Sequence, residues 1–156
     1  MNLVKNFAYV FLFISVLILE LLFGILTQFT EFKVLPFLIL LFFISSYRFS
    51  NSFVYAYFFS GIYYDLFYTS NYFGTTSAKY ITLGILINYI YSNLDSSVYS
   101  EYLTFLIAVL IYNYEIIIYS PSLNSIFIIL SISMMNYFLF KLINITLKRD
   151  VFKKSI

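Results

Sequence analysis

Four ionisable side chains stand inside otherwise apolar stretches of the sequence, and each needs a partner or a task. They are three carboxylates and one ammonium group: Glu20, Asp65, Glu115 and Lys79. An ionised side chain in membrane hydrocarbon costs roughly 2.5 to 3.5 kcal/mol even on lenient insertion scales. A carboxylate placed there can hold the free amide hydrogens of a helix N-terminus or pair with an ammonium group. We therefore expect these side chains to face inward and to form polar contacts.

The residue inventory excludes much of catalytic chemistry. The chain has no cysteine and no histidine, so it has no disulfides, no thiolate or imidazole metal ligands, no cysteine nucleophiles and no Ser-His-Asp triads. The polar residues do not assemble into a nucleophile, a base and an oxyanion donor. A glycosidase-like carboxylate pair would need a water-filled cleft that nothing in the sequence indicates. We expect no enzyme activity, no cofactor and no metal ion, and a net charge of +2 does not indicate nucleic acid.

The composition predicts an all-α integral membrane protein with a single transmembrane domain. Hydrophobic residues make up 62% of the chain and charged residues 10%, against roughly 25% charged in a soluble domain. A helix needs about 20 apolar residues to cross the hydrocarbon. Six segments are candidates for transmembrane helices: 7–26, 34–48, 53–68, 72–91, 102–119 and 123–147. Segments 34–48 and 53–68 are expected to form a tight hairpin, with Arg48 reaching the headgroups.

The basic residues predict the topology. Six of them fall at one set of helix ends: Lys5, Arg48, Lys148, Arg149, Lys153 and Lys154. Lys33 alone lies at the opposite set of ends. The positive-inside rule then places both termini in the cytoplasm. A five-span arrangement, which would put the basic C-terminus outside, is the alternative. Within the last span Lys141 is expected to snorkel to the inner surface, and Asn88, Asn113, Asn136 and Asn144 to bond between helices.

This topology puts the four buried charges in the outer half of the membrane. Glu20 lies six residues before the outer end of its span, Asp65 three before, and Glu115 four before. Lys79 lies seven residues after the outer start of its span. The sequence thus predicts that they converge on one polar cluster, although Asp65 and Glu115 have the alternative of reaching the outer headgroups.

Small residues accompany Asp65 at helical spacing. Gly61 and Asp65 are four residues apart, and Gly74 and Ala78 repeat that spacing at the start of the next span. Small residues let two helix backbones approach closely in lipid. A close hairpin would bring Asp65 to the N-terminus of segment 72–91. Its expected partners there are the backbone near Gly74 and Thr75, the hydroxyls of Thr75, Thr76 or Ser77, and Lys79. Ser70 or Asn71 is a further candidate cap of that helix.

These residues resemble the rod shape-determining MreD family. That family shows a Gly-Leu-x-x-Asp-Leu helix, a short turn and a Leu-Gly-x-x-Ala-Leu helix after an N-terminal hairpin. Residues 61–66 (Gly-Ile-Tyr-Tyr-Asp-Leu) and 73–79 (Phe-Gly-Thr-Thr-Ser-Ala-Lys) fill those positions, and Pro36 opens the preceding helix. The motif match covers about residues 35 to 90, and Lys79 departs from the pattern.

The resemblance implies a non-enzymatic scaffold of the bacterial cytoplasmic (inner) membrane, acting in lateral peptidoglycan synthesis and rod cell shape. It implies MreC as the partner and, through MreC, the actin-like MreB, the glycosyltransferase RodA and its transpeptidase, besides membrane lipid. The chain is also similar in size and helix number to the substrate-binding membrane subunits of energy-coupling-factor vitamin transporters. Those subunits often carry Ala-x-x-x-Ala in the first helix, where this chain has Ala8 and Leu12. Transport is therefore the alternative function.

Overall fold

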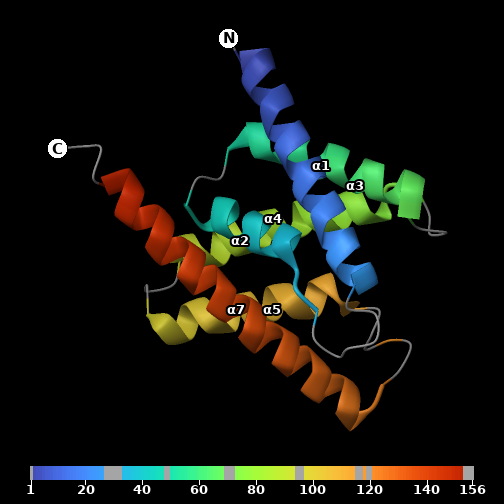
Figure 1. The fold of residues 1–156 in the computed structure, drawn as a ribbon, viewed down its shortest axis with the longest axis vertical. Coiled ribbons are helices and arrows are strands. Elements are labelled where there is room, and N and C mark those ends of the chain that lie inside the picture. Colours follow the sequence, from blue (N-terminus) through green and yellow to red (C-terminus); the bar gives the residue numbers. More distant parts are fainter. Residues whose placement is uncertain are drawn as a thin grey trace.

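The described part of the chain is entirely helical in its regular structure. The computed structural model describes residues 2–26, 33–47, 50–68, 73–93, 97–114, 118 and 121–152. Six helices lie within these ranges, and each falls on one of the six predicted segments (Figure 1): α1 (Asn2–Leu26), α2 (Pro36–Tyr47), α3 (Asn51–Tyr68), α4 (Thr75–Asn93), α5 (Val98–Tyr112) and α7 (Leu123–Phe152). The expectation of an all-α chain is confirmed for these residues.

Two of the helices have the length and apolar composition of a membrane span. These are the segments Phe7–Leu26 of α1 and Leu123–Thr146 of α7, and they indicate association with a membrane. By contrast, α2 has 12 residues and α5 has 15. At 1.5 Å per residue they are about 18 and 22 Å long, less than the roughly 30 Å of membrane hydrocarbon. Among the described residues, two helices are thus long and apolar enough to span a membrane, and helix length and composition do not establish the six spans that the sequence predicted.

Helix α5 differs most from its predicted bounds. It begins at Val98 and ends at Tyr112, whereas the apolar run predicted 102–119. The reason is local capping: the Ser97 side chain accepts a hydrogen bond from the Ser100 amide at 3.2 Å, and this starts the helix earlier. Glu101 consequently lies in the first turn of α5 instead of in the preceding loop.

Helix α2 is the centre of the packing. It contacts α1, α4, α5 and α7. Its sequence is apolar on every side, and a helix of that kind is buried all round. The buried side chains of α2 are Phe37, Leu38, Ile39, Leu41, Phe42 and Ser45. The short segment that was predicted to line up in a hairpin with 53–68 is therefore a core element, and the Ser45 and Tyr57 hydroxyls, 2.8 Å apart, bond it to α3.

α3 packs mainly on α1 and α4. The tight hairpin predicted between 34–48 and 53–68 is therefore not seen, whereas the close hairpin predicted between 53–68 and 72–91 is. Arg48, expected at the headgroups, lies outside the described residues.

Helices α1 and α7 form the outer parts of the molecule. In Figure 1, α1 runs obliquely across α3, and α7 runs obliquely across α5. Both carry many large apolar side chains that no other helix covers, for example Phe11 and Leu22 on α1 and Phe127 and Phe138 on α7. Such a surface is suited to lipid rather than to water.

Candidate functional site

Asp65 holds the start of α4. Its Oδ2 atom accepts hydrogen bonds from the backbone amides of Gly74, at 2.7 Å, and Thr76, at 3.3 Å. These are orphan donors of the helix N-terminus, where the helix dipole also favours an anion. Gly74 has a φ of +93°, a backbone conformation that glycine adopts without strain. The predicted contact between Asp65 and the backbone near Gly74 is confirmed, while Ser70 and Asn71 lie outside the described residues.

One turn before Asp65, at Gly61, α3 and α4 approach each other closely. A Cβ atom built on Gly61 would lie 2.3 Å from the Ser77 Cα atom. The Ser77 hydroxyl donates a hydrogen bond of 2.9 Å to the Phe58 carbonyl across the same contact. Gly61 is therefore required for this packing, as expected. The other two small residues are not part of it: a Cβ atom built on Gly74 would meet nothing within 4 Å, and Ala78 is exposed.

Glu20 does for α2 what Asp65 does for α4. Its Oε2 atom accepts a hydrogen bond of 2.8 Å from the Phe37 amide, in the first turn of α2. Its Oε1 atom accepts a hydrogen bond from the Tyr112 hydroxyl of α5. A partly buried carboxylate of α1 thus links the start of α2 to the end of α5.

Lys79 joins the Glu20 cluster through Tyr112. Its Nζ atom donates a hydrogen bond of 3.4 Å to the Tyr112 carbonyl and lies 5.2 Å from the centre of the Tyr112 ring. The same ammonium group lies 5.5 Å from the ring of Tyr114 and 5.9 Å from that of Tyr80. A cation–π contact contributes about 0.5–1 kcal/mol at an exposed site and more when it is desolvated. Lys79 and Glu20 therefore meet around one tyrosine, as part of the predicted cluster.

The predicted outer cluster is thus divided between two helix starts. Glu20 binds the N-terminus of α2, and Asp65 binds the N-terminus of α4. Glu115, the third carboxylate of the prediction, lies outside the described residues. Glu20 and Asp65 each accept hydrogen bonds from backbone amides of a neighbouring helix. This arrangement fixes the positions of the helices relative to one another.

Asn136 of α7 anchors the segment that leads into α2. Its Oδ1 atom accepts a hydrogen bond of 2.7 Å from the Leu35 amide, and its Nδ2 atom donates one of 2.8 Å to the Lys33 carbonyl. The side chain is fully buried. The expectation that Asn136 bonds across the helix packing is confirmed. Together with Glu20, it satisfies backbone groups around the start of the central helix.

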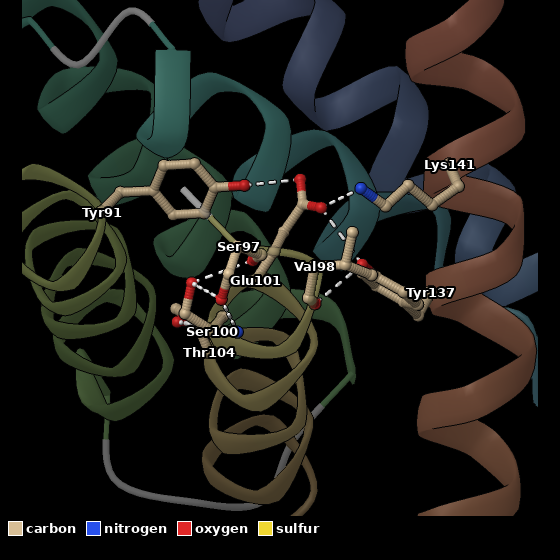
Figure 2. A network of polar contacts seen from close by, with 8 residues as sticks. All are labelled: Tyr91, Ser97, Val98, Ser100, Glu101, Thr104, Tyr137 and Lys141. Atoms are coloured by element: carbon tan, nitrogen blue, oxygen red, sulfur yellow. Dashed lines mark hydrogen bonds and ion pairs between the residues drawn. The ribbon is translucent and has the colours of Figure 1, made fainter. Parts of the chain in front are cut away.

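A second polar cluster, which the sequence did not predict, surrounds Glu101 (Figure 2). Its Oε1 atom accepts a hydrogen bond of 2.6 Å from the Tyr91 hydroxyl of α4. Its Oε2 atom accepts one of 3.1 Å from the Tyr137 hydroxyl and forms an ion pair with Lys141, both on α7. Lys141, which was expected to snorkel, is therefore bound to Glu101. The signal that could have revealed this cluster is the Ser97 cap, which moves Glu101 onto the helix.

The charge state of Glu101 follows from these contacts. The residue precedes the predicted span 102–119. Partial burial acts to raise the pKa of its carboxyl, but the hydrogen bonds from Lys141 and Tyr91 and the charge of Lys141 outweigh burial and bring the pKa below its ordinary value of 4.5. Glu101 is therefore ionised at neutral pH, and it joins the start of α5 to the end of α4 and to the second half of α7.

The sequence and the structure were also compared with known proteins. No protein-family model, no curated protein and no solved structure matches this chain.

Proposed function

We propose that this protein is a non-enzymatic scaffold of the bacterial cytoplasmic membrane that acts in lateral peptidoglycan synthesis, in the manner of the MreD family, with MreC as its direct partner. The observation that carries the proposal is the α3–α4 hairpin. The residues on which the resemblance depends, Gly61, Asp65 and Gly74, have distinct structural tasks in it: close helix packing, capping of α4 and the turn before α4. A motif with these tasks fixes the position of α3 relative to α4.

The arrangement of the polar side chains supports a structural role. The charged groups described above bind backbone amides, hydroxyls or each other within the protein. Such contacts fix the relative positions of helices in lipid. They are needed there because the hydrophobic effect does not drive one apolar helix surface against another within lipid. A scaffold needs this rigidity because its role is to hold its bound partners in fixed relative positions.

The proposed topology has six membrane helices and both termini in the cytoplasm. Two features support it besides the positions of the basic residues. Glu20 lies near the end of α1, beside the start of α2 and the end of α5. Glu101 lies at the start of α5, near the end of α4 and beside the second half of α7. Successive helices that alternate in direction bring these ends together in this way, and α2 fits the scheme as a short helix enclosed by the others.

Co-purification tests the proposal. We would isolate the tagged protein from its native membrane in mild detergent and identify by mass spectrometry the proteins that accompany it. Recovery of MreC, with or without the wall synthases, is the expected result. Recovery of a transmembrane coupling subunit with a pair of ATPases would overturn the proposal in favour of vitamin transport.

A matched pair of variants sharpens the experiment. Asp65→Asn keeps an oxygen that accepts hydrogen bonds from the α4 amides, whereas Asp65→Leu removes it. MreC is expected to accompany the asparagine variant and to be reduced with the leucine variant, compared at equal amounts of the tagged protein. Full MreC recovery with both would show that the hairpin is not the surface that matters.

A further inference from the structure

Helix α5 ends inside the apolar stretch that was predicted to continue to position 119. Its last residue is Tyr112, and Asn113 follows as the C-cap, whose backbone amide donates to the Val109 carbonyl at 3.0 Å. The last carbonyl groups of a helix have no amide partner within it, and the negative end of the helix dipole lies there. Where a helix ends at membrane depth, such carbonyls need donors from elsewhere in the protein. The end of α5 therefore favours a cation.

The ammonium group of Lys79, on α4, lies at this helix end. Its Nζ atom donates a hydrogen bond of 3.4 Å to the Tyr112 carbonyl. The centres of three tyrosine rings lie 5.2, 5.5 and 5.9 Å from Nζ, those of Tyr112, Tyr114 and Tyr80. All three distances fall within the roughly 6 Å at which the face of an aromatic ring attracts a cation. These three rings and the Tyr112 carbonyl are called the tyrosine site, and they combine the groups by which proteins recognise ammonium ligands.

The surroundings of the tyrosine site strengthen it and leave one side of it accessible. The Glu20 carboxylate accepts a hydrogen bond from the Tyr112 hydroxyl, and an anionic acceptor polarises the phenol so that its ring attracts a cation more strongly. The Tyr80 ring is buried and stacks on that of Tyr112, with the ring planes 8° apart. By contrast, Tyr114 is 41% exposed. A small cation can therefore reach the site from outside the protein once the ammonium group of Lys79 is removed.

We infer that the tyrosine site is a binding site for primary alkylammonium ions, which the natural protein fills with its own Lys79. The lysine acts as a tethered ligand that joins α4 to the end of α5 and keeps cations from solution out of the site. The inference goes beyond the proposed function and does not depend on the identity of the protein partner. A site that is filled from within holds two helices together and does not receive a cargo.

Removal of the tethered ligand and its replacement from solution test the inference. Lys79→Ala deletes the side chain beyond Cβ, and the deleted part matches n-propylammonium in length and charge. Thermal unfolding of the purified full-length protein in a mild nonionic detergent is followed by near-ultraviolet circular dichroism at increasing concentrations of propylammonium chloride. 1-Propanol is the uncharged probe of the same shape, and sodium chloride controls for ionic strength. Lys79→Met is the matched variant, because its unbranched side chain fills most of the space without a charge.

Lys79→Ala is expected to unfold at a lower temperature than the natural protein and to regain stability, with saturation, in propylammonium but not in 1-propanol or sodium chloride. The natural protein and Lys79→Met are expected not to respond. When Tyr114→Leu is added to Lys79→Ala, the propylammonium concentration that gives half of the effect should rise about two- to fivefold, because one cation–π contact is lost.

The inference would be overturned if Lys79→Ala did not recover in propylammonium, or recovered equally in 1-propanol. An equal response of the natural protein, or a half-effect concentration that Tyr114→Leu leaves unchanged, would also overturn it. If Lys79→Ala does not fold alone, it is purified in propylammonium chloride, which is then removed by dialysis. Unfolding on removal supports the inference, and failure to fold with the probe present contradicts it. Because no MreC is present, failure here is separate from failure of the co-purification.

Discussion

Replacement of Gly61 by alanine tests the packing of α3 on α4 with a single methyl group. The added Cβ atom would lie 2.3 Å from the Cα atom of Ser77, 2.4 Å from its backbone nitrogen and 2.6 Å from its Oγ atom. Two of these three atoms belong to the backbone, so a change of side-chain rotamer does not relieve the clash. The two helices must move apart at this point.

The size of the effect follows from the geometry. Ordinary contacts of a Cβ atom begin near 3.4 Å, so the helices must separate by about 1 Å. That separation stretches the 2.9 Å hydrogen bond from the Ser77 hydroxyl to the Phe58 carbonyl beyond useful length. Overpacking costs about 1–3 kcal/mol, and the lost hydrogen bond about 1 kcal/mol. Gly61→Ala is expected to lower the free energy of unfolding by about 2–4 kcal/mol.

Gly24→Ala is the matched control. It introduces the same methyl group on α1, where a Cβ atom meets nothing within 4 Å. Alanine in place of glycine within a helix favours folding by roughly 0.5–1 kcal/mol, so no loss of stability is expected there. The assay is unfolding by sodium dodecyl sulfate in mild-detergent micelles, followed by near-ultraviolet circular dichroism of the tyrosines. The chain has 17 tyrosines and no tryptophan, and packed rings such as Tyr57 and Tyr80 report on tertiary structure.

If Gly61→Ala unfolded at the same detergent concentration as Gly24→Ala, the close approach of α3 and α4 would be refuted. A loss of stability in both variants would also count against it, because the effect would then belong to glycine in general.

Three further predictions concern the carboxylates. Asp65→Leu is expected to be less stable than Asp65→Asn by about 1–3 kcal/mol in the same assay, because it leaves buried amides without an acceptor; equal levels of folded Asp65→Leu and natural protein would contradict this. Glu20→Leu is expected to unfold before Glu20→Gln for the same reason at the start of α2, and coincident transitions would contradict it. Glu101 has a folded-state pKa below its ordinary 4.5, so its contribution is complete above that pH and is lost as the pH falls through the folded-state value. The stability difference between the natural protein and Glu101→Gln should therefore shrink in acid, and a difference that does not change with pH would contradict the pairing with Lys141.

Local features of the fold were predictable from the sequence. All six described helices fall on segments that their apolar composition marked out. The contact of Asp65 with the start of α4 was also predictable, because Asp65 and Gly74 are nine positions apart and a short turn joins their helices. Capping was the local signal that was overlooked: the Ser97 cap moves the start of α5 to Val98 and places Glu101 on the helix.

The sequence by itself thus determined the helical class, the positions of the helices and the hairpin contact of Asp65, since these depend on composition and on residues close along the chain. Only the tertiary structure decided that Ser77 rather than Ala78 faces Gly61, that Glu20 binds the start of α2, and that Lys141 pairs with Glu101. These contacts depend on the rotation and depth of each helix relative to its neighbours. Packing around the buried helix α2 sets those quantities, and an apolar helix offers many rotations of similar energy until its neighbours select one.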